Sequence, residues 1–231
     1  MDAYILCGGF GTRLRSVISD SQKAVADIHG RPFLALVLAQ LREAGIRRGV
    51  LCAHYRADQL ATLLPELEAG SGLMLELVVE EAPMGTGGAL LNALREVPPE
   101  GRYLVLNADT FLESRAYQLA MQAEGEVLVV TYVDDRARYG SVRHSADGKV
   151  LGFEEKGQVG GGWVSAGVYG FASDALAAVA VEPCSMEEDL LPALIRQQRL
   201  SICEYMGAFV DIGTPDSLDA FKTDFTGSVG R

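Results

Sequence analysis

The chain has 231 residues, of which 48% are hydrophobic, and carries 20 Lys and Arg against 31 Asp and Glu, giving a formal net charge of −11. This length suits one α/β domain spanning 1–231, and the acidic balance argues against nucleic acid or an anionic membrane as a partner. Residues 1–31 differ, because four basic residues stand there against three acidic ones. An anionic ligand is therefore best tolerated near the start of the chain.

Strand-like and helix-like segments alternate over the first half of the chain. Short apolar runs predict buried strands at Ala3–Cys7, Gly49–Ala53, Leu73–Val79 and Arg102–Asn107. Helices are predicted at Pro32–Ala44, at Tyr55–Leu64, which Pro65 should close, and between the glycines of 85–88 and Pro98. This alternation is typical of a single Rossmann-like, doubly wound, mostly parallel sheet.

The second half departs from this rhythm and is expected to complete the same sheet. Strands are predicted at Glu126–Val133, Gly140–His144, Lys149–Phe153, Trp163–Phe171 and Phe209–Ile212, with a hairpin turn at 145–148. Ser185 begins a capping box ahead of a helix that Pro192 should kink or split. A final helix is expected after Pro215, with Asp216 as its cap.

The cysteines and the start of the chain indicate a cytoplasmic protein. The four cysteines form no Cys-x-x-Cys pair, which predicts free thiols in a reducing compartment. Asp2 and the early glycines interrupt any signal-peptide core. No apolar run approaches the roughly 18 residues that a membrane-spanning helix needs.

Three polar loops that contain glycine or end an apolar strand lie at 8–23, 83–88 and 107–110. In open α/β sheets, ligands bind beyond the carboxyl ends of the strands. The three loops are therefore expected to lie together at one edge of the sheet.

The first loop has the composition of a triphosphate site. Gly8, Gly9 and Gly11 leave room for phosphate oxygens against the backbone, and Arg13 and Lys23 are cations that such an anion attracts. The spacing matches neither a Walker loop nor a dinucleotide fingerprint. The alternatives are a tight turn for the glycines and simple solvation for the two cations.

Two carboxylates from distant parts of the chain are candidates for a Mg²⁺ site. Asp109 ends an apolar strand, and Asp211 stands between apolar residues, where an unpaired carboxylate is unfavourable. With phosphate oxygens and water, two carboxylates can complete the octahedral shell of Mg²⁺. The alternatives are a turn or helix cap for Asp109 and a buried salt bridge or turn cap for Asp211.

Two further motifs have the chemistry of ligand contacts. The glycines of 85–88 open a helix, whose backbone N–H groups can bind an anion or read the edge of a base. A flexible turn is the alternative. Glu155 can accept hydrogen bonds from sugar hydroxyls and Lys156 can bind a sugar phosphate, although an exposed ion pair explains both equally.

Seven motifs, several of them containing these candidate residues, occur in order along nearly the whole chain. They are GGFGTRL (8–14) with Lys23, GTGGA (85–89), LNADT (106–110), YGSV (139–142), FEEK (153–156), SAGVY (165–169) and VDIGTP (210–215). In this order they resemble the sugar-1-phosphate nucleotidyltransferase family. The stretches 13–34 and 80–90 are most similar to its heptose 1-phosphate guanylyltransferase branch. The resemblance implies a Rossmann-like nucleotidyltransferase fold without the C-terminal β-helix of larger members.

The resemblance also implies a reaction. GMP would pass from GTP to a sugar 1-phosphate, first of all a D-glycero-α-D-manno-heptose 1-phosphate, with release of pyrophosphate. Arg13 and Lys23 would be the catalytic cations, and Asp109 and Asp211 would hold Mg²⁺. Physical reasoning alone leaves the base, the sugar and the oligomeric state open. Mannose 1-phosphate with GTP, a hexose 1-phosphate with UTP or CTP, and a sensing subunit without catalysis remain alternatives.

The same resemblance implies which residues contact the substrates. Those implied for the nucleotide are Cys7, Gly8, Gly9, Gly11, Thr12, Arg13, Met84, Gly85, Thr86, Gly88, Asn107 and Ala108. Those implied for the sugar are Gly140, Glu155, Lys156, Ser165 and Gly167.

Two positions depart from the family pattern. Gln22 stands where the family usually has Pro before the loop lysine, and because Pro would stiffen the chain, Gln22 is expected to loosen it. Ser165 stands where the family usually has Asn, and its side chain reaches less far toward the sugar.

Overall fold

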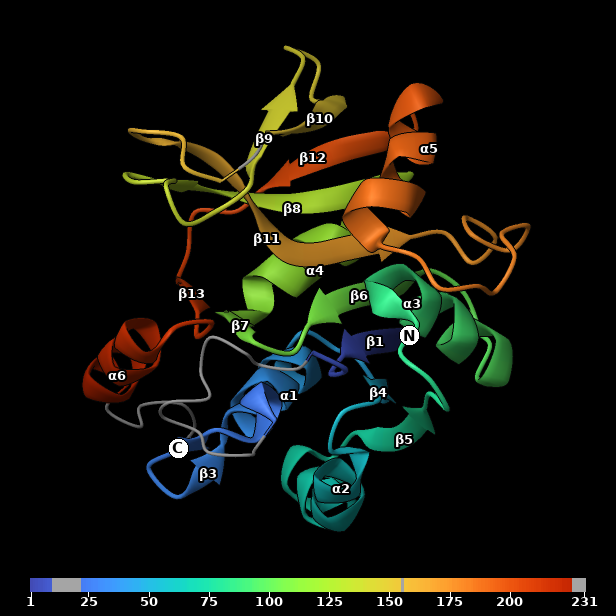
Figure 1. The fold of residues 1–231 in the computed structure, drawn as a ribbon, viewed down its shortest axis with the longest axis vertical. Helices are drawn as coiled ribbons and strands as arrows, with labels where there is room; N and C mark the ends of the chain where they lie inside the picture. Colours follow the sequence, from blue (N-terminus) through green and yellow to red (C-terminus); the bar gives the residue numbers. More distant parts are fainter. Residues whose placement is uncertain (10–21, 155, 226–231) are drawn as a thin grey trace.

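The computed structural model describes residues 1–9, 22–154 and 156–225, and its main feature is a nine-stranded sheet (Figure 1). Four parallel strands form its first part, in the spatial order β6-β1-β4-β5. They are β1 (Asp2–Leu6), β4 (Arg48–Ala53), β5 (Met74–Val79) and β6 (Tyr103–Asn107). Leu6 pairs with Asn107, so β1 and β6 end side by side at the same edge of the sheet.

The second part of the sheet introduces antiparallel neighbours. β11 (Gly162–Phe171) pairs antiparallel with β6 and with β8 (Glu126–Val133), and β12 (Leu200–Glu204) runs parallel to β8. The expected hairpin is present as β9 (Ser141–His144) and β10 (Val150–Glu154). The parallel strands β6, β1, β4 and β5 confirm the doubly wound, mostly parallel sheet that the alternation of segments predicted. The antiparallel neighbours of β11 extend this sheet.

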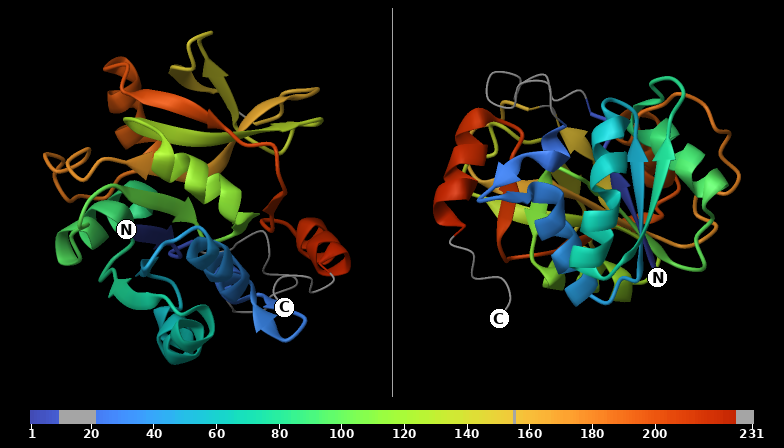
Figure 2. Two further views of the ribbon diagram at one scale, coloured as in Figure 1. Left: turned by 180° about the vertical axis from the view of Figure 1, so that it is seen from behind. Right: turned by 90° about the horizontal axis from the view of Figure 1, so that it is seen from below.

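Helices cover both faces of the sheet. Neighbouring strand residues point to opposite sides, so a strand that is apolar throughout needs an apolar layer on each face. Ala3 and Ile5 belong to one apolar core and Tyr4 to the other. The first core contains residues of α1 (Phe33–Glu43), α2 (Ala57–Ser71), α4 (Ser114–Gln122) and α6 (Pro215–Asp224). The second contains residues of α3 (Gly85–Glu96), of the π-helical turn η3 (Met186–Leu190) and of α5 (Leu191–Arg196). Figure 2 shows α4 in front when the molecule is seen from behind.

Two small strand pairs and a short helix shape the edge where β1 and β6 end. β7 (Thr110–Leu112) pairs antiparallel with β13 (Phe209–Asp211), which places Asp211 opposite Thr110. β2 (Asp27–Ile28) pairs with β3 (Arg31–Pro32), just after the 3-10 turn η2 (Lys23–Val25). The β7–β13 pair therefore brings together two segments that lie about 100 residues apart in the chain.

Several local predictions were wrong or incomplete. Helix α2 does not end at Pro65 but continues through it to Ser71. Pro65 and Ala61 both lie on the exposed side, so water can solvate the carbonyl group that the missing N–H leaves free. The cap of α6 is Thr214, which forms a capping box with Ser217, and not Asp216.

The region around Pro192 splits as expected. Ser185 Oγ accepts the N–H of Glu188 at 3.2 Å, and the π-helical turn passes into α5 one residue before Pro192. Three elements, β7, α4 and β12, were not expected from the sequence. Within the described residues, no helix is both long and apolar enough to cross a membrane.

Candidate functional site

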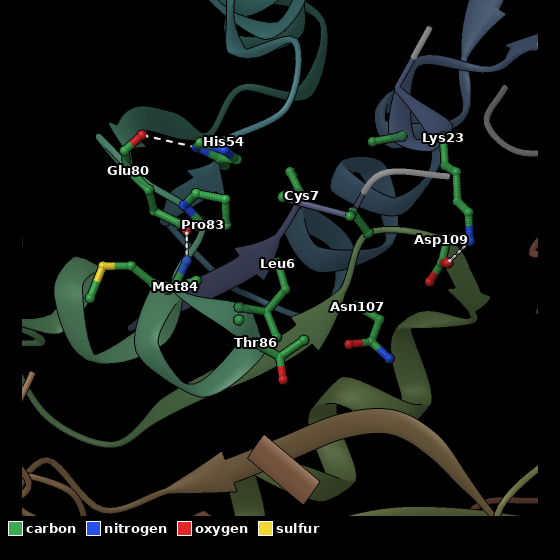
Figure 3. A pocket seen from close by; sticks show the side chains of 16 residues that line it. Leu6, Cys7, Lys23, His54, Glu80, Pro83, Met84, Thr86, Asn107 and Asp109 are labelled. Atoms are coloured by element: carbon green, nitrogen blue, oxygen red, sulfur yellow. Dashed lines mark hydrogen bonds and ion pairs between the residues drawn. The ribbon is translucent and has the colours of Figure 1, made fainter. Parts of the chain in front are cut away.

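The ends of β1 and β6 and the start of α3 enclose a cavity of about 340 Å³ (Figure 3). Its lining residues come from all three loops that the sequence analysis expected to lie together. Those among the predicted nucleotide-binding residues are Cys7, Gly8, Gly9, Met84, Gly85, Thr86, Asn107 and Ala108. Lys23 and Asp109 line the same cavity.

Lys23 and Asp109 form an ion pair at one side of this cavity. Lys23 Nζ donates to Asp109 Oδ2 at 3.0 Å, and both side chains are about one quarter exposed, at 21% and 27%. Lys23 begins η2, whereas Asp109 follows β6, so the pair joins two separate loops. The alternative that Lys23 is simply solvated does not describe this arrangement.

Asp211 lies beside this pair because β13 pairs with β7. The N–H of Ile212 donates to the carbonyl oxygen of Asp109 at 3.0 Å, and Gly213 N–H donates to Asp211 Oδ1 at 2.5 Å. Burial raises the pKa of Asp211, and the negative charge of Asp109 raises it further. The contact with Gly213 is the turn cap considered as an alternative, but it leaves a partly buried carboxylate next to a second one. Such a pair is suited to bind a cation.

The opposite side of the cavity carries a buried carboxylate that the sequence analysis did not select. Figure 3 shows Glu80 and His54 across the pocket from Lys23 and Asp109. Glu80 is 6% exposed, and its Oε2 accepts the N–H of Met84 at 2.9 Å. Burial raises the pKa of Glu80, although the Met84 N–H and the nearby His54 oppose that shift. The available sequence signal for a place in the cavity was its position two residues before Ala82-Pro83 in a polar loop.

The start of α3 differs from the expectation of free backbone donors. The N–H groups of Gly87 and Gly88 both donate to the carbonyl oxygen of Cys184, at 2.9 and 3.2 Å. A Cβ at Gly88 would come within 2.7 Å of the Glu182 carbonyl oxygen, so this glycine is needed for close packing. Gly88 does not line the cavity, whereas Gly85 and Thr86 do. The prediction that these N–H groups are open to an anion is therefore wrong for Gly87 and Gly88.

A second and larger cavity, of about 900 Å³, lies between β11, β10 and η3. Four of the predicted sugar-binding residues line it, namely Gly140, Lys156, Ser165 and Gly167. Asn107 and Asp211 line it as well, and a third cavity of about 350 Å³ includes Lys23, Asn107, Asp109, Lys156 and Asp211. The three cavities therefore meet around Asn107.

An irregularity in β11 shapes this junction. The β8–β11 register shifts between Ser165 and Tyr169, and Gly167 between them has φ +67°. A Cβ at Gly167 would lie 2.7 Å from Asn107 Nδ2, so only glycine allows this close approach. Ser165 Oγ accepts the Gly167 N–H at 3.2 Å, which uses the short side chain within the bulge.

The larger cavity also contains charged residues that the sequence analysis missed. They are Arg138, Glu154, Glu187, Glu188 and Arg196. Arg138 donates to Thr214 Oγ1 at 3.2 Å and so links the β8–β9 connection to the start of α6. Its position beside the Tyr139-Gly140 motif was the available signal. Gly11, Thr12, Arg13 and Glu155 fall outside the described residues.

The chain matches the family described as "Nucleotidyl transferase" over residues 2–226. It is 31% identical to the D-glycero-alpha-D-manno-heptose 1-phosphate guanylyltransferase of Campylobacter jejuni, over 94% of this chain and 96% of that protein. It is 33% identical to the mannose-1-phosphate guanylyltransferase catalytic subunit beta of Drosophila pseudoobscura, over 92% of this chain. That alignment covers 59% of the relative, so the chain spans only part of the mannose-1-phosphate relative.

Solved structures are similar to this chain over nearly its whole length. The crystal structure of HddC from Yersinia pseudotuberculosis superposes with a TM-score of 0.83 at 30% identity, covering 97% of this chain and 99% of that one. The same protein complexed with GMP-PN gives a TM-score of 0.82 at 29% identity. Because the family match covers nearly the whole chain, the protein belongs to the nucleotidyl transferase family.

Proposed function

We propose that the chain transfers GMP from GTP to a sugar 1-phosphate, with D-glycero-α-D-manno-heptose 1-phosphate as the first candidate acceptor. The products would be a GDP-sugar and pyrophosphate. The observation that carries this proposal is the meeting of two cavities at Asn107, with Lys23, Asp109 and Asp211 beside the junction. A nucleotide in the smaller cavity and a sugar in the larger one would bring their phosphates together there. The heptose acceptor is supported by the relative of matching length, which bears that name.

The chemistry requires orientation and charge neutralisation more than a protein nucleophile. A phosphate oxygen of the sugar 1-phosphate attacks the α-phosphorus, and the bond from that phosphorus to the bridging oxygen breaks as pyrophosphate leaves. Lys23 would exchange its contact with Asp109 for one with phosphate oxygens. Arg13 is proposed to bind the departing pyrophosphate. Lys156, at the edge of the larger cavity, is proposed to bind the sugar phosphate.

The carboxylates of Asp109 and Asp211 fit a Mg²⁺ ion. Mg²⁺ is commonly bound by one or two protein carboxylates and takes its other ligands from phosphates and water. The part of the chain that the structure describes contains no group of three or more His, Cys, Asp and Glu that could hold a metal by itself. The carboxylate pair would therefore depend on the substrates to complete the shell. When bound, Mg²⁺ would supply neutralisation of phosphate charge.

The buried carboxylate of Glu80 supports GTP as the donor. Guanine has two adjacent donors, N1–H and the 2-amino group, whereas no other common base presents such a pair on one edge. A carboxylate has four acceptor positions, so Glu80 can keep the Met84 N–H and still accept both guanine donors. Its place across the pocket from Lys23 fits a base at one side and phosphates at the other (Figure 3).

We also propose that residues 1–231 form one catalytic domain that works in the cytoplasm. Its product, an activated heptose, would be consumed by glycosyltransferases that build surface glycans.

A substrate grid tests the proposed function. GTP, ATP, UTP and CTP are each combined with heptose, mannose and glucose 1-phosphates in Mg²⁺ buffer, and pyrophosphate release is measured. The proposal expects the highest kcat/KM for GTP with the heptose 1-phosphate, and no release after addition of a chelator. A preference for mannose 1-phosphate or for UTP or CTP would replace the substrate pair. No turnover with any pair, but binding of a nucleotide sugar, would indicate a sensing subunit instead.

A further inference from the structure

We infer that Gln22 is a positioning residue that holds Lys23 in place by hydrogen bonds to Tyr55, between β4 and α2, and to Gln59, in the first turn of α2. This inference rests on the proposed function, because it assigns Gln22 a role through Lys23. It concerns a position at which the family usually has Pro, and at which the sequence analysis expected a looser chain.

Gln22 is tightly held in the structure. It is 1% exposed, its backbone N–H donates to Gln59 Oε1 at 3.1 Å, and its side-chain Nε2 donates to the carbonyl oxygen of Tyr55. Its φ of −65° and ψ of 144° are values that Pro also adopts. Gln22 therefore has the backbone conformation of Pro but obtains it from contacts with another segment. The expectation that Gln22 loosens the chain concerns a loop of which residues 10–21 lie outside the described residues; Gln22 itself is fixed by two hydrogen bonds.

A backbone hydrogen bond of Gln22 also fixes the turn that contains Lys23. The carbonyl oxygen of Gln22 accepts the N–H of Val25 at 3.1 Å, which closes the η2 turn that Lys23 begins. One side of this turn is thus attached through Gln22 to Tyr55 and to Gln59 at the start of α2. The other side is attached through Lys23 to Asp109, after β6. The turn therefore connects two sides of the cavity, and Lys23 is its first residue.

The side-chain oxygen of Gln22 indicates that this residue does more than fill space. Within the described residues, Gln22 Oε1 is buried and has no hydrogen-bond partner. A buried amide with an unpaired oxygen is less favourable than an apolar side chain of similar size. The amide is therefore best explained by the bond from its nitrogen to Tyr55, which an apolar side chain cannot form.

Precise placement of Lys23 matters because the proposed reaction depends on orientation. A displacement of about 1 Å at a reacting group can reduce the rate by about 10²-fold. Gln22→Met keeps the length of the side chain but removes the bond to Tyr55. We expect it to lower kcat about tenfold while the KM for the sugar 1-phosphate changes less than about twofold.

Gln40→Met is the matched control. Gln40 is also buried, at 5% exposed, and its Oε1 accepts the N–H of Ser114 at 2.8 Å, but it lies on α1 and lines none of the three cavities. Gln40→Met should lower the thermal midpoint without changing kcat. Equal kcat values for Gln22→Met, Gln40→Met and the unmodified protein would overturn the inference.

A second readout does not need activity. The rate at which acetic anhydride acetylates Lys23 is measured by peptide mapping without substrates, with Lys149, which donates to Ser201 Oγ, as the internal reference. Gln22→Met should raise the Lys23 rate relative to Lys149 several-fold, and Gln40→Met should not. An unchanged ratio would overturn the inference even if the proposed function holds. If Gln22→Met does not fold, Gln59→Leu, which removes the acceptor of the Gln22 N–H, decides by the same two measurements.

Discussion

Lys23 Nζ lies 3.0 Å from Asp109 Oδ2, across a separation of 86 residues in the chain. The pair connects the turn after the glycine loop to the end of β6. Within this pair, each group neutralises the charge of the other. Nucleotide binding would replace this contact by phosphate oxygens at Lys23 and a cation at Asp109. The pair therefore lies beside Asn107, where the three cavities meet.

Replacing Lys23 should impair turnover far more than folding. Lys23→Met removes the cation that we propose lies next to the reacting phosphates, and we expect kcat to fall about 10²–10³-fold. Lys149→Met is the control, because Lys149 is outside the cleft and should retain full activity. Steady-state pyrophosphate release checks both. A fall of less than about threefold for Lys23→Met would remove Lys23 from the proposed mechanism.

Asp211→Asn should separate stability from activity. Asp211 is a partly buried carboxylate beside Asp109, and the Asn side-chain oxygen can still accept the Gly213 N–H. The metal-free variant should therefore be more stable, by on the order of 1 kcal/mol, because a destabilising functional charge is lost. Its turnover should be abolished, and Mg²⁺ with GTP should no longer raise its thermal midpoint. Normal turnover would exclude Asp211 as a metal ligand.

The Glu80 proposal predicts a change in base preference. Inosine triphosphate lacks the 2-amino group, so the unmodified protein should prefer GTP over it by about 10–100-fold in kcat/KM. Glu80→Gln should reduce this preference to a few-fold, because one acceptor of the pair becomes a donor. Glu81→Gln makes the same change of charge at an exposed neighbour that does not line the cavity, and it should retain the preference. Identical ratios for both variants would contradict the assignment.

The same residue predicts a pH dependence. Burial raises the pKa of Glu80, so the neutral form persists to a higher pH in the folded chain than in the unfolded chain. This group's contribution to stability is therefore lost as the pH rises through that raised pKa. Binding of guanine needs the carboxylate, so GTP affinity should fall as the pH drops through the same range, above that of an ordinary Glu. Calorimetric titration of GTP should show this fall in the unmodified protein and not in Glu80→Gln.

Two glycines in helices should respond to alanine with opposite signs. A Cβ at Gly88 would meet the backbone at Glu182 at 2.7 Å, so Gly88→Ala should lower the free energy of unfolding by about 1–3 kcal/mol. A Cβ at Gly70 in α2 meets nothing within 4 Å, so Gly70→Ala should raise it by about 0.5–1 kcal/mol. Denaturant unfolding measures both. A stable Gly88→Ala with a raised KM for GTP would instead favour the nucleotide contact implied by the resemblance.

Much of the fold could be predicted from local patterns. The apolar runs located β1, β4, β5 and β6 within about one residue, because buried parallel strands are continuously apolar. The predicted end of α2 at Pro65 failed, since the exposed side of a helix tolerates the lost hydrogen bond. β12 was missed because Leu200–Glu204 has a weak apolar pattern. In the structure only one of its side chains, Leu200, is fully buried.

The candidate site was predicted in the same uneven way. Glycines, cations and carboxylates after strands pointed to Gly8, Lys23 and Asp109, and these residues do line one cavity. Glu80 and Arg138 were missed because a single charged residue in a polar loop has no periodicity to distinguish it. Their significance depends on what lies opposite them across the cavity.

The sequence by itself therefore determined the alternating strands and helices, the edge of the sheet where the loops gather, and the residue types available there. These features follow from preferences that act within a few residues and from the fixed direction of parallel strands. Only the tertiary structure decided how distant groups use one another. Gln22 is held by Tyr55 and Gln59, and the helix donors of Gly87 and Gly88 are used by Cys184, because packing over long separations chooses hydrogen-bond partners that no local pattern encodes.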